Sequence, residues 1–564
     1  MDGGARQEEM AARLKQEVKE MAAQRRERHS SGDSVSPVIT VGRESATGNP
    51  EGLLIPARDA EVAEEASLTV TETHRNGEAT SPAPSQPEVS AARQQRGKDC
   101  SRSGRYARES VAFGRSDTVL LTFYLEQLFP FLFPFYRPSL LEGGRAWVLE
   151  LMISSPVVRQ AALCQSSYFF SLARETGEGG LVWEAMLQQT GEVFEVLRES
   201  LQVIQSSGVT EHIHGAVRIM SSSLQVQRFE ASVLSFSNCW VHLNASRTLF
   251  KQMLDASSAA QPSEPSARFK TVMERLGPPT WIEPIQLPVL SAEQAAFRFS
   301  SALLILDDII ASTVLQEEPT LYEYHHSLLC GNPMLETPAS IDLEAVVGCQ
   351  NWALLQIGQI AALDAWKQRC KNAGNLSVMD LVSRATTIKD SLEIHLEQLC
   401  TNPVSAPAVG ATSLLDMLAA DYGSSHADAN PNAPTGQTIL VTRAWAHAAL
   451  AYLSVVVSGW QPANIEVRHH VGRVVELLTC EMSPPALLRT MVWPFCVAGC
   501  LAQPAQEEHL RGMVEALQPP SVFGTLRKAL EIMEGVWRSR DAGDNANRDL
   551  AMCFRSQGGL VLLV

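Results

Sequence analysis

Cysteine is sparse in this sequence, and its spacing excludes the common zinc sites. The chain has 564 residues and 11 cysteines, the first of which is Cys100. Zinc sites use ligand pairs at short fixed spacing, such as C-x-x-C, whereas the closest pair here, Cys496 and Cys500, is four positions apart in an apolar run. These two could hold a metal only with two distant ligands, so we expect them to pack in a core. The N-terminus is polar and charged rather than a secretory signal, which favours a reducing compartment with free thiols.

The sequence also lacks the short motifs of common enzymes. It contains no G-x-S-x-G, no G-x-x-x-x-G-K-[ST], and no G-x-G-x-x-G after a strand. The residues that most suggest catalysis are Asp307 and Asp308 in LDDIIA. They are similar to the start of the DDxxD motif, which binds magnesium and diphosphate in helical isoprenoid synthases. The fifth position is Ala311 here, and no second carboxylate-rich motif is visible. We therefore expect an acidic pair on a helix surface. An all-helical isoprenoid-type enzyme that uses Asp307 and Asp308 with magnesium is the alternative function.

Histidine and tryptophan supply the remaining candidates for a site. None of the histidine pairs has a cysteine, aspartate or histidine partner at ligand spacing, so we expect them at the surface or at the edge of the core. Five tryptophans have apolar neighbours at helical spacing and are expected to anchor the core rather than to form a ligand cage. The sequence thus predicts no catalytic, cofactor-binding or metal-binding residue. The residues concerned are His212, His214, His325, His326, His469 and His470, and Trp240, Trp352, Trp366, Trp445 and Trp493.

No hydrophobic run is well suited to a membrane. Residues 119–135 form an apolar stretch of 17, but two prolines interrupt it and a bilayer requires roughly 20 residues. Residues 438–457 are long enough, but Arg443 and His447 lie near the middle, where a charge in lipid costs several kcal/mol. We therefore expect a buried helix of a large helical bundle and no membrane association.

Charge is distributed unevenly along the chain. The formal net charge is -16, with 46 basic and 62 acidic side chains. Residues 1–116 hold 17 of the basic and 18 of the acidic side chains, which leaves residues 117–564 with 29 against 44. A body with a net charge of about -15 repels phosphate, so we expect no nucleic-acid contact from it.

The first 116 residues contain few side chains that could form a hydrophobic core. An apolar stripe from Met10 to Met21 predicts a short amphipathic helix within residues 1–28, which could also be half of a weak coiled coil. Residues 29–116 are rich in Ser, Thr, Pro and Gly with scarcely an aromatic side chain, which is typical of a disordered linker. The basic end of this segment, from Arg93 to Arg115, is typical of a solvated tail, a nuclear import signal or a weak phosphate contact.

Residues 117–564 show helical periodicity almost throughout and predict one all-α, bundle-like domain. The apolar stripe from Trp183 to Ile204 is one clear case. Residues 257–288 and 402–434 are rich in proline and glycine, and we expect them to be long loops over the helical body. No strand-like alternation competes with the helical pattern. The predicted helices cover residues 156–174, 229–255, 292–312, 341–371, 379–399, 436–458, 465–480, 485–502 and 523–538.

Apolar and tryptophan-bearing segments follow one another along this domain: FYLEQLFPFLFPFYRPSL, PVVRQAALCQSSYFFSLA, NCWVHLNASRTLF, SSALLILDDIIAS, VVGCQNWALLQIGQIAALDAWK, TRAWAHAALAYLSVVVSG, VWPFCVAGCLA, GVWRSR and GGLVLLV. In order and in approximate spacing, they resemble the fungal-specific transcription factor domain, the regulatory region of fungal binuclear zinc cluster factors. The resemblance covers about four fifths of the chain. One departure is Leu306, because the family usually has an aromatic residue at that place before the aspartate.

The resemblance implies a non-enzymatic transcription regulator that acts in the nucleus. It also implies contacts with DNA through a zinc module, contacts with the transcription machinery or co-regulators, and a homodimer. Residues 1–28 resemble the segment that directly follows the zinc cluster in one branch of the family, but the six cysteines that would hold two zinc ions are missing. Two explanations stay open: a truncated product, or a form without its DNA-binding module. Zinc is expected as a cofactor only if an upstream cluster is present.

Overall fold

The computed structural model describes most of the predicted helical domain. The predicted helix within residues 1–28, the predicted linker up to residue 112, the apolar stripe from Trp183 to Ile204 and the predicted loop 402–434 all lie outside the described residues. The described residues are 113–139, 143–174, 209, 211–232, 236–256, 264–282, 287–331, 338–401, 436–540, 548–555 and 561–564.

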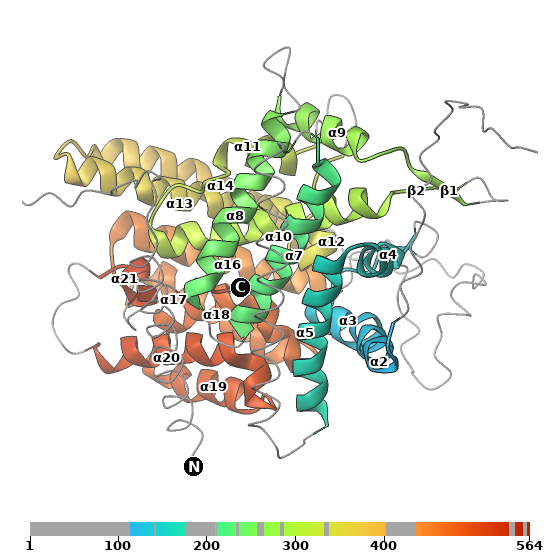
Figure 1. Cartoon of the computed structure of the whole chain (residues 1–564). Coiled ribbons are helices and arrows are strands. Elements are labelled where there is room, and N and C mark those ends of the chain that lie inside the picture. The colour runs from blue at the N-terminus through green and yellow to red at the C-terminus, as the bar shows by residue number, and fades with distance from the viewer. Residues whose placement is uncertain are drawn as a thin grey trace, which may run out of the picture. The chain divides into compact units, whose positions relative to one another are not determined.

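The described part of the chain is all-α apart from one short hairpin, which confirms the predicted fold class (Figure 1). Short π-helical turns η1 (Tyr124–Leu128) and η3 (Leu477–Glu481) and 3₁₀-helical turns η4 (Pro485–Met491) and η5 (Pro520–Phe523) adjoin some of the α-helices. In chain order the α-helices are α2 (Arg115–Phe123), α3 (Phe129–Leu132), α4 (Ala146–Ser154), α5 (Pro156–Ala173), α7 (Ile213–Ser232), α8 (Phe236–Asp255), α9 (Pro265–Arg275), α10 (Ala292–Leu315), α11 (Tyr322–Leu329), α12 (Glu344–Val347), α13 (Asn351–Asn372), α14 (Val378–Thr401), α16 (Gly436–Ser458), α17 (Ile465–Glu476), α18 (Val492–Cys500), α19 (Pro504–Glu515), α20 (Gly524–Arg538) and α21 (Leu550–Arg555).

Helix α10 is the central element of the described core. Ser291 and Gln294 form a capping box at its start: Gln294 N donates to Ser291 Oγ at 3.2 Å, and Ser291 N donates to Gln294 Oε1 at 2.9 Å. The helix ends at Gln316, whose left-handed φ of 60° stops it. Every side chain from Phe299 to Val314 is buried. A helix buried on all sides must have other elements around it, and it fixes their positions.

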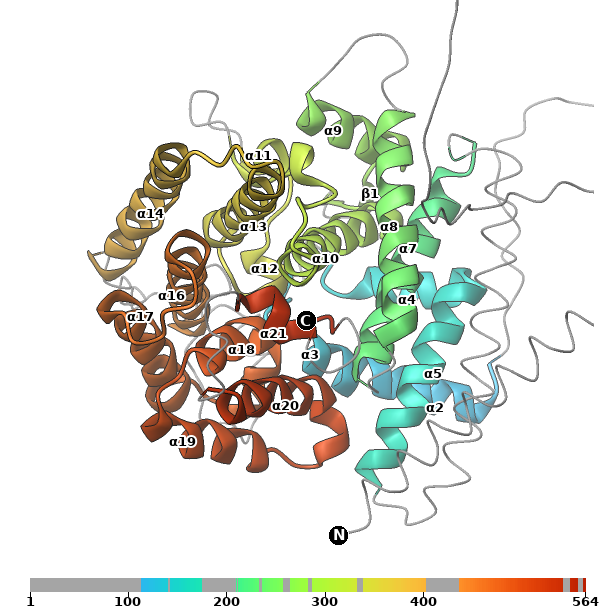
Figure 2. The same cartoon turned by 90° about the vertical axis from the view of Figure 1, so that its left-hand side faces the viewer.

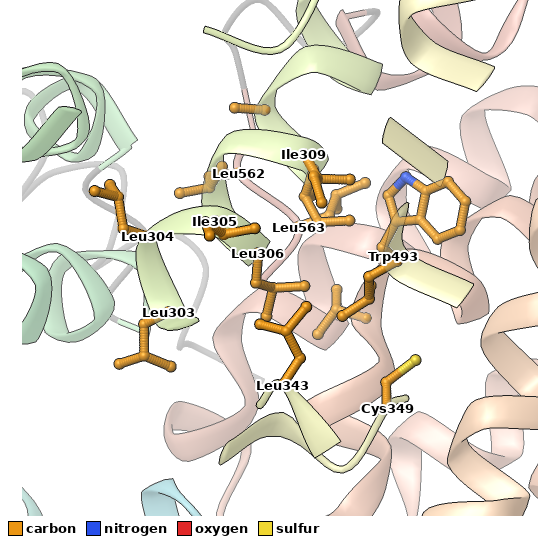
Figure 3. Packing of buried hydrophobic residues seen from close by; sticks show 14 of the residues in the cluster. Leu303, Leu304, Ile305, Leu306, Ile309, Leu343, Cys349, Trp493, Leu562 and Leu563 are labelled. Atoms are coloured by element: carbon orange, nitrogen blue, oxygen red, sulfur yellow. The ribbon is translucent and has the colours of Figure 1, made fainter. Parts of the chain in front are cut away.

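Segments far apart in the sequence surround α10. Helices α4, α7 and α8 pack against it, and so do α13 and α21. In Figure 2, α7 and α8 lie on one side of α10, and α13 with α14 lies on the other. Figure 3 shows side chains of α10 directed to different sides, with residues of distant segments near them; the labelled ones are Leu303, Leu304, Ile305, Leu306 and Ile309 of α10, and Leu343, Cys349, Trp493, Leu562 and Leu563.

Helix α16 confirms the expected buried apolar helix. Among the described residues it alone is long and apolar enough to cross a membrane, but 72% of its most apolar window is buried inside the protein. Its Arg443 forms an ion pair with Glu481, with Nη1 3.7 Å from Oε2. The apolar surface of this helix is therefore used for packing against α13, α14, α17 and α18.

One long predicted helix is wrong in its bounds. The structure divides residues 213–255 into α7 and α8, and α7 begins at Ile213, well before the predicted start at residue 229. The missed part contains the polar run Ser221–Ser223 and two glutamines, Gln225 and Gln227, which hide the helical pattern of apolar residues. All of them are buried, because neighbouring helices cover this face. Helix α10 provides hydrogen-bond partners for Ser221 and Gln227, and Ser222 donates to the carbonyl oxygen of Arg218 on α7 itself.

The predicted loop 257–288 is also partly wrong. It contains α9, which starts with Pro265 at its first position, and the antiparallel strands β1 (Thr280–Ile282) and β2 (Leu287–Val289). The proline, taken as a loop signal, instead starts a helix because its missing N–H has no partner to lose there. Phe269 and Val272 bury the inner face of α9.

The predicted helix 341–371 is broken at Gly348. This glycine has a φ of 78° and ends the short α12, and α13 starts three residues later. A Cβ atom at this position would lie 2.5 Å from the ring of Phe135. Positive φ and the close ring both require glycine here, so the glycine of the GCQNW segment fixes a turn against the aromatic residues that open the domain.

Candidate functional site

Asp307 is buried in the centre of α10, so its predicted surface position is wrong. Its side chain is 0% exposed. The Oδ1 atom accepts a hydrogen bond from Arg228 Nη2 at 2.7 Å, and Oδ2 accepts one from Gln227 Nε2 at 2.7 Å. Burial raises the pKa of Asp307, and the positive charge of Arg228 opposes that rise. Both oxygens are used for joining α10 to α7.

Asp308 is also fully buried and turns to a second arginine. Its Oδ1 lies 2.6 Å from Arg247 Nε of α8, and its Oδ2 accepts a hydrogen bond from Leu321 N at 2.9 Å. The His325 Nε2 atom of α11 lies 3.5 Å from Oδ2. Magnesium requires carboxylate oxygens that are free to reach it together with water. Asp307 and Asp308 each bind a separate arginine, so they do not fit that requirement. The pair instead joins α10 to α7, α8 and α11.

The histidines divide into exposed and buried ones, and the prediction of surface or core-edge positions is wrong for two of them. His212, His214, His326 and His469 are exposed. His325 and His470 are buried, because α11 packs against α13 and α17 packs against α16.

One pair of histidines is in contact in the helical body. The Nδ1 atoms of His447 on α16 and His470 on α17 lie 3.1 Å apart. Burial lowers the pKa of His447 to about 3 and that of His470 to about 4, so both are neutral at neutral pH. Over the residues that the structure describes, no group of three or more His, Cys, Asp or Glu side chains is arranged to hold a metal ion.

The tryptophan prediction is confirmed for two residues and is too strong for three. Trp445 and Trp493 are buried, and their rings stack with centroids 5.6 Å apart. Trp493 Nε1 donates to Thr313 Oγ1 at 2.9 Å, which ties α18 to α10. The half-buried ones are Trp240, Trp352 and Trp366.

Cys496 and Cys500 are buried free thiols, as predicted. Both lie on α18, which packs against α20 and α21. Cys500 is hydrogen-bonded to Cys496 and to Cys553 of α21, and the bond from Cys496 together with burial raises the pKa of Cys500. A thiol whose pKa is raised in this way stays protonated and unreactive. Cys496 and Cys500 therefore serve to pack the C-terminal helices together.

Two of the cavities lined by described residues could admit a ligand. The first, of ≈ 120 Å³, lies where α3, α5, α7 and α10 meet η4 and α20, and Arg228 and Arg489 are in its lining. The second is a groove of ≈ 700 Å³ beside Trp352 of α13 and His395 of α14, whose rings stack with centroids 4.8 Å apart. Sequence reasoning missed both arginines of the first cavity. The signal available for Arg228 was its position at the end of the uncharged stretch 219–227.

Comparison with known proteins defines the class of this protein as a fungal regulator of transcription. The chain belongs to the family with the fungal specific transcription factor domain, which matches residues 119–558. That range contains the buried acidic pair, the whole lining of the second cavity, the lining of the first cavity except Leu563 and Val564, and most of the described helices. No solved structure matches the chain.

Several characterised fungal regulators are similar to this chain. The transcription factor dibT of Pestalotiopsis microspora is 39% identical over 449 residues, which is 78% of this chain and 70% of that protein. The trichothecene biosynthesis transcription regulator of Fusarium sporotrichioides is 28% identical over 75% of this chain and 92% of its own length. The pestheic acid cluster transcriptional regulator 3 of Pestalotiopsis fici is 24% identical over 75% of this chain and 71% of its own length. The chain is therefore a transcription regulator of the fungal type, and the isoprenoid-enzyme alternative is not supported.

Proposed function

We propose that this chain is the regulatory region of a zinc-cluster regulator that acts in the nucleus and has no catalytic activity of its own. The match of residues 119–558 to the fungal specific transcription factor domain is the observation that carries the proposal. The ion pairs of Asp307 and Asp308 support its non-enzymatic part, because they leave the carboxylates engaged with Arg228 and Arg247. A fluorescent fusion tests the location: we expect nuclear signal, and replacing the arginines from Arg93 to Arg115 with alanine tests whether that segment directs import.

Specific DNA contacts would come from a zinc module that this sequence does not contain. Residues 117–564 are acidic, and the first cysteine is Cys100, so neither a basic body nor a six-cysteine cluster is present in the 564 residues. Any DNA affinity of the chain by itself would come from the basic segments and would weaken steeply with salt.

Gel-shift titrations at two salt concentrations test whether specific DNA binding needs the zinc module and whether the chain by itself binds DNA only non-specifically. The chain alone should bind all sequences alike and lose most of its affinity at the higher salt. A fusion with a six-cysteine zinc module should gain zinc-dependent binding to the site of that module. Site-specific binding by the chain alone would show that it carries its own DNA reader.

The genes under control are proposed to be those of a biosynthetic cluster. Two of the relatives described above carry names that state such a role, in trichothecene biosynthesis and in the pestheic acid cluster. Deleting the gene and sequencing the RNA should change the transcripts of one contiguous set of biosynthetic genes, and reintroducing the gene should restore them. Unchanged biosynthetic transcripts would contradict the proposal.

The remaining parts of the proposal concern organisation and partners. We propose that residues 29–116 link a short pairing helix in residues 1–28 to the domain in residues 117–564, and that the protein works as a homodimer that recruits co-regulators. Limited proteolysis should leave a core that begins between residues 102 and 117. Sedimentation should show a dimer that Leu14→Glu weakens, because a charge in the apolar stripe opposes pairing.

A further inference from the structure

The groove beside Trp352 has the size of a site for small molecules. Its volume is ≈ 700 Å³, and protein pockets for such ligands have volumes of about 300 to 1,000 Å³. It lies where α11, α13 and α14 meet the segment that leads into α12, and α13 packs against both α11 and α14 (Figure 2). Because packed helices form its walls, the groove is present before any ligand binds.

One part of the groove is an aromatic and apolar surface. The rings of Trp352 and His395 stack with an angle of 13° between their planes, and Leu355 lines the groove with them. Both rings are held by hydrogen bonds: Trp352 Nε1 donates to Gln350 Oε1 at 2.7 Å, and His395 Nδ1 donates to the carbonyl oxygen of Ser391 at 2.6 Å. A surface of this kind suits the ring of an aromatic ligand.

The formal charge of the lining is negative. Asp342 and Glu344 contribute two carboxylates, and the exposed Arg298 contributes one guanidinium. Glu344 is half-buried, and its burial together with the charge of Asp342 raises its pKa, whereas hydrogen bonds with Thr438 and Gln350 oppose the rise. No cationic side chain of the described residues acts on this pKa. A cation bound beside Glu344 would stabilise its charged form.

Gln350 connects the carboxylate to the aromatic surface. Its side chain accepts the hydrogen bond of Trp352 and is also hydrogen-bonded to Glu344, so these two groups lie on the same side of the groove. Glu344 Oε1 also accepts a hydrogen bond from Thr438 Oγ1 at 2.9 Å. An ionised carboxylate can accept about four hydrogen bonds, so the two neutral partners leave acceptor positions for a further donor.

We propose that this groove binds an amphipathic organic ammonium ion, with its charged nitrogen on Glu344 and an aromatic part against Trp352 and Leu355. An ammonium group supplies both hydrogen-bond donors and a positive charge, and tryptophan is the side chain whose ring attracts cations most strongly. A carboxylic acid would add a third negative charge beside Asp342 and Glu344. The net charge of about -15 on residues 117–564 also favours a cation.

The bound amine would touch several helices at once. The lining includes residues of α11, α13 and α14, so a ligand that binds the folded domain would stabilise their packing. The role of the amine as an effector of transcription rests on the proposed regulatory function, whereas its binding does not.

Calorimetric titration of the purified full chain with three matched indoles tests the binding. Tryptamine, tryptophol and indole-3-propionate share the ring and a two-carbon chain, and they end in a positive, a neutral and a negative group. Tryptamine should bind with a Kd of about 0.1 to 1 mM, and the other two should bind at least about tenfold more weakly. Equal affinity for tryptamine and tryptophol would overturn the proposal. So would the absence of tryptamine binding up to about 10 mM.

Three variants locate the site. Glu344→Gln should weaken tryptamine binding at least about tenfold, because it removes the charge and keeps an acceptor for Thr438. Glu318→Gln is the matched control: Glu318 pairs with Arg369 outside the groove, so binding should stay within about twofold. Ala339→Trp should block binding by filling the groove while Glu344 remains.

Unchanged tryptamine binding in Glu344→Gln, or in Ala339→Trp, would overturn the assignment of the site. If Glu344→Gln does not fold, Ala339→Trp and the comparison of the three indoles on the unaltered chain still decide.

A reporter assay separates binding from regulation. Tryptamine added to cells should shift the output of the unaltered regulator, and the Ala339→Trp variant should not respond. Binding without any response would overturn only the effector role. A failure of transcription regulation in the absence of the amine would concern the proposed function and leave the calorimetric result standing.

Discussion

Asp307 of α10 and Arg228 of α7 form an ion pair of 2.7 Å in the interior, with the carboxylate fully buried and 79 positions of sequence between the partners. Asp308, the next residue, repeats the arrangement with Arg247 of α8 at 2.6 Å. Two adjacent side chains thus bind two different helices. The pairing sets the position of α7 and α8 around α10, and with it the position of Arg228 in the wall of the smaller cavity.

Replacing Asp307 alone should destabilise the protein more than replacing Asp307 and Arg228 together. Asp307→Leu leaves the Arg228 charge uncompensated and should lower the free energy of unfolding by about 3 to 5 kcal/mol. The double variant Asp307→Leu with Arg228→Met should recover much of the loss, because both charges are gone. Denaturant titrations of the unaltered protein, Asp307→Leu, Arg228→Met and the double variant measure the coupling between the two residues. Losses that simply add would mean that the pair is not coupled.

The free energy of unfolding should decrease on acidification, over a pH range set by the two buried histidines His447 and His470. The pKa of His470 is lowered from 6.5 to about 4 by burial and the neighbouring charge of His469, and that of His447 to about 3 by burial and His470. The folded protein therefore binds fewer protons than the unfolded chain. The corresponding stability is fully present above pH 6.5 and is lost as the pH falls towards about 4.

Substituting a buried histidine tests this window. His470→Gln should reduce the loss of stability between neutral pH and pH 4 by about 1 to 3 kcal/mol. The exposed His214 supplies the control, since His214→Gln should leave the pH profile as it is. Melting temperatures measured across the range give the profile. Parallel profiles for His470→Gln and the unaltered protein would contradict the assignment.

Two tryptophans of the family-like segments should differ in their contribution to stability. Trp493 is 0% exposed, so Trp493→Ala should cost about 3 to 5 kcal/mol. Trp352 is half-buried beside a groove and stacks on His395, so Trp352→Ala should cost less, about 1 to 2 kcal/mol. Trp493→Phe keeps most of the ring but leaves the Thr313 hydroxyl without its donor. This variant should lower the free energy of unfolding by about 1 kcal/mol. Denaturant unfolding measures all three, and equal losses for the two alanine variants would refute the difference in burial.

Gly348 and Gly459 form a matched pair for testing the turn before α13. Both have a φ of 78°, but an added Cβ would lie 2.5 Å from Phe135 at Gly348 and would meet nothing within 4 Å at Gly459. Gly459→Ala should therefore cost only the backbone strain, about 1 to 2 kcal/mol. Gly348→Ala should cost that strain and the displacement of the ring as well. Equal melting temperatures for the two variants would show that the ring moves away freely.

Much of the fold could be predicted because the helices are apolar and regularly patterned. Helix α16 has the predicted bounds, and α5, α10 and α14 differ from prediction by a few residues. The failures have a common physical cause. Residues Ser221–Ser223 and Gln227 are polar but buried, so a pattern based on hydrophobicity does not find the helix that contains them. Pro265 starts a helix in a segment where proline indicated a loop.

The candidate site was less predictable, since it depends on contacts between distant helices. Asp307 and Asp308 look like a surface pair in the sequence, and only the packing of α7 and α8 against α10 supplies their arginines. The lining of the smaller cavity includes residues of α7, α16 and η4, and no local spacing connects Arg228, Trp445 and Arg489. The family, by contrast, could be predicted from the sequence, because several short segments resemble those of the family and follow one another in the same order.

The most direct test of the account is a reporter assay with the chain fused to an unrelated DNA-binding module. A promoter of intermediate basal activity reports both activation and repression. The account predicts that the fusion changes transcription in one direction relative to the module alone, and that Asp307→Leu, which disrupts the core of the regulatory domain, reduces the change. Transcription equal to that of the module alone, with the fusion present in the nucleus and bound to its site, would contradict the claim that this chain is a transcription regulator.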